Sequence, residues 1–285
     1  MERVHFQGLL STTAKRRRFL LGAGTLTASA IASLWTHKVV ALSRFSAYPF
    51  SLGVASGDPL PDSVVLWTRL APDPLNGGGM PQVNVPVRWQ IALDENMRQV
   101  VLRGVTLATP ELAHSVHVNV RGLESNRWYW YQFKVGNEES AIGRTRTAPA
   151  IGTRLNQLNF AFVTCQKWED GFYSAYRRLA EEDLDLVFHL GDYIYEYGIP
   201  ATGGVRNVSL PEEFRKETNT LEQYRLRYAL YKTDPDLQKA HALFPFTVTW
   251  DDHEVENDYT DDISENNDRG QKVSRKACCC LSGLL

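Results

Sequence analysis

The sequence predicts an all-β sandwich followed by an α/β domain. Over residues 45–148, apolar and polar residues alternate and turn-forming residues separate the runs, a pattern typical of antiparallel strands. After residue 155, short apolar runs alternate with helical patterns, which indicates parallel strands joined by right-handed crossovers. The segment from Thr147 to Ala150 lies between the two patterns, and we interpret it as a linker.

Composition limits the classes of protein to consider. A chain of 285 residues has room for about two domains. Its 43% hydrophobic and 22% charged residues are ordinary for a globular protein, which argues against disorder throughout. The formal net charge is −2, and there is no basic patch beyond the first residues of the chain, so we expect no specific binding of nucleic acid.

Residues 1–44 are predicted to be an export signal. Basic residues from Lys15 to Arg18 precede a short, weakly apolar run from Leu21 to Leu34. The order Arg-Arg-x-Phe-Leu resembles a twin-arginine signal, which directs the export of folded proteins. We therefore expect the twin-arginine export machinery as a partner and a secreted or periplasmic location. The alternative is a single membrane anchor, but glycine and hydroxyl residues in the run suit a span of about 20 residues poorly, so no stable membrane span is expected.

Five runs rich in β-branched and aromatic residues are the predicted strands of the first domain. They cover residues 63–69, 85–93, 100–106, 114–120 and 128–135. The spacing of Tyr129, Tyr131 and Phe133 after Leu123 resembles the late strands of fibronectin III-like domains. Residues 45–148 are thus expected to form a β-sandwich N-terminal domain with a scaffolding role.

The second domain is predicted as strand, helix, strand, helix and strand. The predicted elements are a buried strand at 159–164, a helix at 171–182, a strand at 184–190, a helical stretch at 221–232 and a strand at 246–250. Cys165, Asp192 and Asp252 each follow the end of one of these strands. In an open α/β sheet the carboxyl ends of the strands converge on the ligand, so these three side chains are candidate metal ligands.

Each candidate also has a purely structural interpretation. Asp192, with Tyr195 three residues later, is either a pair of metal ligands or a strand end with a solvated carboxylate and packing tyrosines. Asp252 and His253 are either a metal ligand and a donor to a substrate oxygen or part of a solvated acidic turn. Cys165 taken alone is better explained as a buried structural thiol. Three adjacent cysteines, Cys278 to Cys280, fit neither a spaced disulfide framework nor a zinc site.

Three motifs taken together are far more specific. Thr164-Cys165-Gln166, the run from His189 to Glu196, and the run from Trp250 to Glu254 resemble, in order and spacing, the PhoD family of phosphatases and phosphodiesterases. The resemblance extends from about residue 50 to residue 276. It implies an α/β metallophosphatase domain with four αββα layers, of which residues 155–277 are the first half, and it implies hydrolysis of phosphate monoesters or diesters.

The resemblance also assigns roles to individual residues. Cys165 and Tyr195 would bind Fe3+, Asp192 would bridge iron to Ca2+, and Asp252 would bind the second metal. Asp251 would assist the binding of Ca2+. His253 matches the catalytic histidine that stabilises the phosphoryl oxygens. The implied mechanism is in-line attack on the phosphate ester substrate between two cations about 3.5–4 Å apart.

The end of the sequence departs from the family pattern. Metallophosphatases have a second half that supplies further ligands, usually histidines, but no histidine follows His253. We therefore expect the catalytic domain to be truncated and activity to be impaired. The alternative function is a non-catalytic exported protein whose β-sandwich acts as a binding module.

Residues 278–285 are expected to be an aberrant tail that a change of reading frame would explain; the alternatives are palmitoylated cysteines or an exposed tail. Relatives are expected to continue with Ala-Ala-Ala-Tyr-Gln-Ala-Tyr-Tyr-Glu after Ala277. Codons for that peptide, read from the preceding nucleotide, encode Cys-Cys-Cys-Leu-Ser-Gly-Leu-Leu and a stop, which is the sequence observed. Resequencing the gene beyond this point tests the hypothesis: we expect an open frame for the missing half, and its absence would refute a frameshift.

Overall fold

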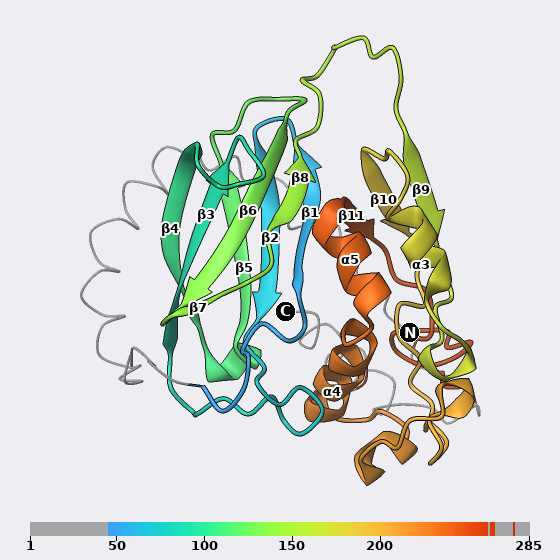
Figure 1. Ribbon diagram of the computed structural model, residues 1–285. Helices are drawn as coiled ribbons and strands as arrows, with labels where there is room; N and C mark the ends of the chain where they lie inside the picture. Colours follow the sequence, from blue (N-terminus) through green and yellow to red (C-terminus); the bar gives the residue numbers. More distant parts are fainter. Residues whose placement is uncertain (1–44, 262, 266–275, 277–285) are drawn as a thin grey trace, which may run out of the picture. The chain divides into compact units, whose positions relative to one another are not determined.

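Two β-sheets form the framework of the protein (Figure 1). The computed structural model describes residues 45–261, 263–265 and 276. The predicted signal, residues 1–44, and the predicted tail, residues 278–285, lie outside the described residues. No helix in the described part of the chain is long and apolar enough to cross a membrane.

The N-terminal region contributes to both sheets. Three of its strands belong to a six-stranded sheet: β1 (Val54–Leu60), β2 (Ser63–Arg69) and β5 (Ser115–Arg121). The others form a five-stranded sheet: β3 (Val85–Ala92), β4 (Val100–Ala108), β6 (Trp128–Val135), β7 (Glu138–Glu139) and β8 (Gly143–Arg146). All five predicted strands are confirmed, with boundaries within two residues, whereas β1, β7 and β8 were not predicted.

A shared hydrophobic core holds these two sheets together. Val64 and Leu66 of β2 face it from one sheet, and Tyr131 and Phe133 of β6 face it from the other. The intervening residue of β2, Val65, is only partly buried, because successive side chains of a strand point to opposite faces. The alternation of apolar and polar residues in the sequence therefore identifies the side chains that lie on the inner face of the sandwich.

The C-terminal region adds three parallel strands with helices packed against them. Its strands are β9 (Phe160–Val163), β10 (Leu186–His189) and β11 (Pro245–Val248). Its helices are α3 (Ser174–Leu179), α4 (Leu221–Lys232) and α5 (Pro235–Leu243), with short 3-10 turns at η2 (Trp168–Asp170), η3 (Gly204–Arg206) and η4 (Glu212–Arg215). A further 3-10 turn, η1 (Pro110–Leu112), lies between β4 and β5 of the N-terminal region. The predicted parallel order is confirmed, and α4 has the predicted bounds.

Local signals explain where the two longer helices begin. Thr220 and Gln223 form a reciprocal capping box at the start of α4. The Asp234 carboxylate accepts hydrogen bonds from two backbone N–H groups at the start of α5, and Pro235 takes the first helical position. The helix predicted at 171–182 is shorter than expected, since α3 covers only Ser174–Leu179.

Strands from both regions share the six-stranded sheet. Its order is β5-β2-β1-β11-β10-β9, and β1 pairs in parallel with β11 through Ser56 with Pro245 and Gly57 with Phe246. The sheet therefore runs without a break from the sandwich into the α/β part of the chain.

One face of the α/β strands is covered and the other is open. Val187 and Phe246 lie in a core with residues of α4 and α5, including Leu230 and Leu237. On the opposite face, Phe160 is 51% exposed and Phe162 is 68% exposed. The prediction of a fully buried strand at 159–164 is wrong for this face, because the helices of the described chain pack on the other one.

Replacement of Gly57 is expected to weaken the junction between β1 and β11. A Cβ atom at Gly57 would lie 2.7 Å from the carbonyl oxygen of Phe246 on the adjacent strand. Gly57→Ala should lower the free energy of unfolding by about 1–3 kcal/mol, measured by urea denaturation. Gly171→Ala is the control, since Gly171 is extended and a Cβ atom there would have no neighbour within 4 Å. Equal stability of the two variants would contradict the argument.

Candidate functional site

The carboxyl ends of β9, β10 and β11 lie together, as the sheet order requires. Two of the predicted ligands there have left-handed backbone conformations, with φ of +55° at both Cys165 and Asp192. Gly191 has φ of +100°, and a Cβ at this position would lie 2.5 Å from the Cβ of Asp251. The chain can make this sharp turn after β10 only because residue 191 is glycine.

Asp192 is the centre of a group of three predicted ligands. Its Oδ2 atom lies 3.3 Å from the Cys165 Sγ atom and accepts a hydrogen bond of 3.0 Å from the Tyr195 hydroxyl. Its Oδ1 atom is buried and has no hydrogen-bond partner in the described chain. A buried carboxylate oxygen without a partner is unfavourable unless a cation or a donor reaches it.

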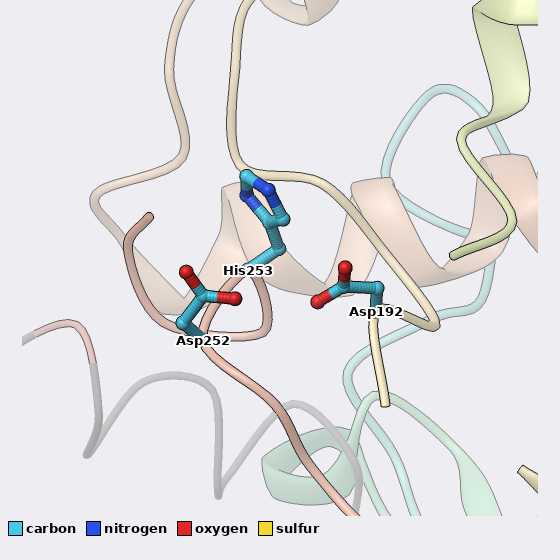
Figure 2. Close-up of side chains that lie close together, drawn as sticks. All are labelled: Asp192, Asp252 and His253. Atoms are coloured by element: carbon cyan, nitrogen blue, oxygen red, sulfur yellow. The ribbon is translucent and has the colours of Figure 1, made fainter. Parts of the chain in front are cut away.

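A second group joins Asp192 to the loop after β11. One ligand atom each from Asp192, Asp252 and His253 lies within 4.8 Å of the others. Figure 2 shows the two carboxylates pointing toward one another, with the imidazole ring beside them. Asp192 therefore belongs to both groups, which is the position expected of a carboxylate shared by two cations.

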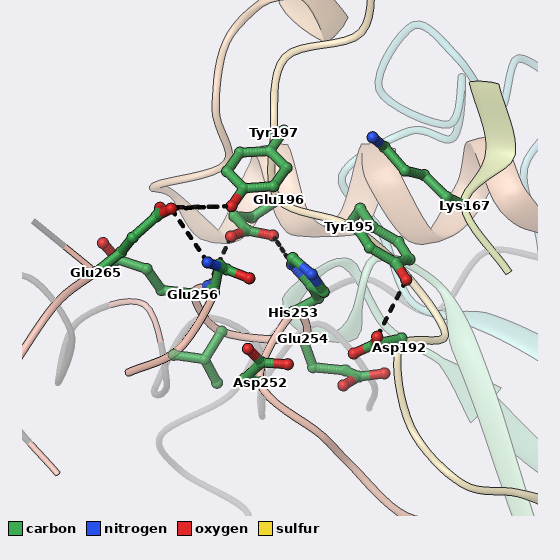
Figure 3. Close-up of polar contacts among 12 residues, drawn as sticks. Lys167, Asp192, Tyr195, Glu196, Tyr197, Asp252, His253, Glu254, Glu256 and Glu265 are labelled. Atoms are coloured by element: carbon green, nitrogen blue, oxygen red, sulfur yellow. Dashed lines mark hydrogen bonds and ion pairs between the residues drawn. The ribbon is translucent and has the colours of Figure 1, made fainter. Parts of the chain in front are cut away.

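The orientation of His253 is set by Glu196. The Glu196 Oε2 atom lies 2.9 Å from His253 Nδ1, and its Oε1 atom accepts a 2.8 Å hydrogen bond from the Asn257 backbone N–H (Figure 3). The Tyr195 ring packs on the imidazole with a centroid distance of 4.1 Å. Burial lowers the pKa of His253, but the Glu196 carboxylate together with those of Asp192 and Asp252 raises it more, so the net shift is upward.

Glu254 ties together the two loops that carry the candidate ligands Asp192 and Asp252. It is fully buried, and its carboxylate accepts hydrogen bonds from the backbone N–H groups of Tyr193 and Asp251. Burial raises the pKa of Glu254, while these N–H donors act in the opposite direction. The loops after β10 and β11 are thus held together by one side chain.

Arg227 of α4 supports the loop after β10. Its side chain is 1% exposed and donates hydrogen bonds to the backbone carbonyls of Tyr195, Tyr197 and Lys216. The Tyr231 hydroxyl of the same helix accepts hydrogen bonds from the backbone N–H groups of Tyr195 and Trp168. Helix α4 therefore fixes the backbone that carries Tyr195.

Two structural interpretations made from the sequence are wrong. Cys165 is exposed rather than a buried structural thiol. Glu254 and Glu256 are buried, so the run after Asp251 is not a solvated acidic turn, and Lys276 pairs with Glu256 at 3.1 Å. The side chain of Asp251 is exposed and lies outside the group formed by Asp192, Asp252 and His253.

Sequence reasoning did not identify Glu196, Glu254 and Arg227. Glu196 and Glu254 stand at the ends of the two longest motifs, each directly after a predicted functional residue. This position is the feature of the sequence that could have identified them as part of the site. Arg227 gave no local signal, because one arginine in a helix is usually solvated.

The side chains brought together offer thiol, phenol, carboxylate and imidazole groups. Carboxylate oxygens suit hard cations such as Ca2+, and deprotonated oxygen and sulfur donors suit transition metals. Burial, reinforced by the Asp192 carboxylate, raises the pKa of Tyr195, so a phenolate here would need the charge of a cation. The unpartnered Asp192 Oδ1 fits such a cation.

Known proteins match both regions of the chain. Residues 160–279 match the sequence profile of the PhoD-like phosphatase family, and residues 35–149 match the profile of the PhoD-like phosphatase N-terminal domain. The chain belongs to the PhoD-like phosphatase family. Alkaline phosphatase D of Bacillus subtilis (strain 168) is 51% identical over 282 residues of alignment, and the match covers 96% of this PhoD-like chain and 47% of that relative.

A solved structure supports the same assignment. The structure described as that of PhoD is 53% identical, with a TM-score of 0.78, over 85% of this chain and 46% of the solved one. This PhoD-like chain spans about half the length of the relatives it matches. The resemblance noted from the three motifs is therefore confirmed at the level of the family.

Proposed function

We propose that this chain carries the first half of a two-metal centre that hydrolyses phosphate monoesters or diesters. The observation that carries the proposal is the double environment of Asp192: one group contains Cys165 and Tyr195, and the other contains Asp252 and His253. The membership of the chain in the PhoD-like phosphatase family and its similarity to alkaline phosphatase D of Bacillus subtilis support a phosphatase reaction.

The donor set of the first group suits Fe3+. Cys165, Tyr195 and Asp192 would supply a thiolate, a phenolate and a carboxylate, all of them anionic once a trivalent cation displaces their protons. In the second group, Asp192 and Asp252 would supply carboxylates to Ca2+. The two cations, when bound, would offset the charge on the attacking and leaving oxygens of an in-line displacement.

His253 would stabilise the phosphoryl oxygens directly. Glu196 lies at the Nδ1 atom of the ring, which leaves Nε2 as the nitrogen that can donate to the substrate. The carboxylate favours the protonated ring, and the packed Tyr195 ring restricts its rotation. A donor held before the reaction begins stabilises developing charge without reorganisation in the transition state.

The remainder of the catalytic domain would cover the open face of β9 and β10. Phe160 and Phe188 form an edge-to-face pair on this face, and Phe162 is in register with Phe188. More than half of the length of alkaline phosphatase D lies outside the region matched by this chain. We infer that this part completes the αββα layers and the ligand set, and that residues 45–148 are the fibronectin III-like sandwich that precedes it.

Export belongs to the same proposal. The order of arginines and apolar residues between Lys15 and Leu34 supports a twin-arginine signal, and the protein would then act in the periplasm or outside the cell. Folding before export would allow the metal centre to form before translocation.

Ferric iron added to the 285-residue chain should produce a visible absorption band from charge transfer by its phenolate and thiolate ligands. Tyr195→Phe should remove most of the phenolate contribution, because it deletes the oxygen beside Asp192. Tyr197→Phe is the matched control, since the Tyr197 hydroxyl points to Glu265 instead. Identical spectra from the two variants would show that Tyr195 is no ligand, whether or not the protein is an enzyme.

Hydrolysis is expected to need the part of alkaline phosphatase D that lies outside the matched region, and it should depend on Asp192. The chain extended with the remaining part of alkaline phosphatase D of Bacillus subtilis should hydrolyse p-nitrophenyl phosphate or its bis ester when Fe3+ and Ca2+ are supplied. Removal of the metals by a chelator should abolish turnover, and their return should restore it. Asp192→Asn should lower kcat/KM by at least about 100-fold, since one substitution affects both cations.

The control for hydrolysis is Asp62→Asn, an exposed aspartate in the turn between β1 and β2. Its kcat/KM should stay within about two-fold of the unsubstituted protein. Full activity of Asp192→Asn in the extended chain would contradict the proposed centre.

A further inference from the structure

A cavity of about 270 Å3 lies on the face of the six-stranded sheet that points away from the sandwich core. Register places Trp67 of β2 beside Ala55 of β1 and His117 of β5, so these three side chains share that face. Helix α4 contributes Tyr228 and Lys232 to the walls of the cavity. We call this space the Lys232 cavity.

Lys232 brings a positive charge into the cavity without a partner of opposite charge. Its ammonium lies 4.4 Å from the centre of the Trp67 ring and 5.4 Å from the centre of the Tyr193 ring. Within the described part of the chain, the ammonium has no hydrogen bond and no ion pair. Burial, with no charged neighbour to oppose it, lowers the pKa of Lys232 to about 7. A cation in such surroundings is unfavourable until an anion reaches it.

The groups around Lys232 do not offset its positive charge. Burial and the Lys232 charge both lower the pKa values of His117 and His241, and they lower that of His189 to about 4. The two carboxylates that line the cavity do not compensate. Glu254 is engaged by backbone N–H groups, and Asp58 is exposed and forms no described ion pair with Lys232.

The remaining walls are apolar and largely aromatic. Trp67, Tyr193, Phe246, Val248 and Trp250 line the cavity. At about 30 Å3 for each water-sized group, the cavity has room for about nine such groups, which is the size of one substituted aromatic ring. Apolar walls and one unpaired cation together select a ligand that has an apolar body and a single anionic head.

We propose that the Lys232 cavity binds a small organic anion with an aromatic or apolar body, its carboxylate or phosphonate group paired with the Lys232 ammonium. The site is distinct from the proposed metal centre, because Cys165, Asp192, Tyr195 and Asp252 are not among its lining residues. The two sites are adjacent, because Tyr193 and Glu254 line the cavity and directly follow Asp192 and His253 in the chain. The inference does not depend on the proposed phosphatase activity.

Phenylphosphonate is a suitable probe, because it has an aromatic ring and an anionic head but no ester bond to hydrolyse. Isothermal titration of the 285-residue chain, with a chelator present to remove metal ions, should give one site with a Kd of about 1 mM or tighter. Lys232→Met should weaken binding at least ten-fold. Lys239→Met, a change of the same kind on the exposed side of α5, should have no effect. Benzyl alcohol, which lacks the charge, should bind at least ten-fold more weakly than phenylphosphonate.

Two further variants separate the alternatives. Val65→Phe narrows the cavity without altering Lys232 and should also weaken binding, so the proposal stays testable if Lys232→Met does not fold. Asp192→Asn should leave the affinity unchanged. Absence of binding, equal affinity of Lys232→Met and the unsubstituted chain, or loss of binding in Asp192→Asn would each overturn the assignment, and the last would place the anion in the metal centre.

Discussion

The buried carboxylate of Glu254 is the interaction on which the rest of the site depends. It joins the backbone of Tyr193, just after Asp192, to the backbone of Asp251, just before Asp252. Two loops that are separated by about sixty residues are therefore kept at a fixed spacing by hydrogen bonds to a charged acceptor, which are stronger than those between neutral groups. The carboxylates and the imidazole that face one another do so because their backbones have little freedom to move apart.

The strands and helices could be predicted where successive residues follow one pattern, either the alternation of a strand or the start signal of a helix. Strands β2, β3 and β6 follow the alternation imposed by a core on one side, and α4 has a capping signal at its start. Strand β1 was missed because it contains Gly57, Asp58 and Pro59, which are typical of turns, and because its pairing with β2 shifts register between Gly57 and Leu60. Its pairing with β2 is antiparallel and its pairing with β11 is parallel, and no local pattern reveals the second of these.

The candidate ligands of the site could be predicted, but the side chains that support them could not. Cys165, Asp192 and Asp252 could be singled out because parallel strands deliver their following residues to one edge of the sheet. Glu196, Glu254 and Arg227 are buried charges whose partners are distant in the sequence. The sequence alone does not show whether a charged residue is buried or solvated. Only the fold shows that these three hold the histidine and the loops in place.

The parallel pair formed by β1 and β11 also sets the order of events during synthesis. Ser56 pairs with Pro245, which is synthesised much later. At about 5–20 residues per second, the ribosome needs about 10–40 s to get from one residue to the other. Throughout that time the edge of β1 that later pairs with β11 has no neighbouring strand. An open strand edge of this kind can pair with other chains. Strands β1, β2 and β5 can pair with one another before β11 is made, so the open edge of β1 is the place where a nascent chain can pair with another copy.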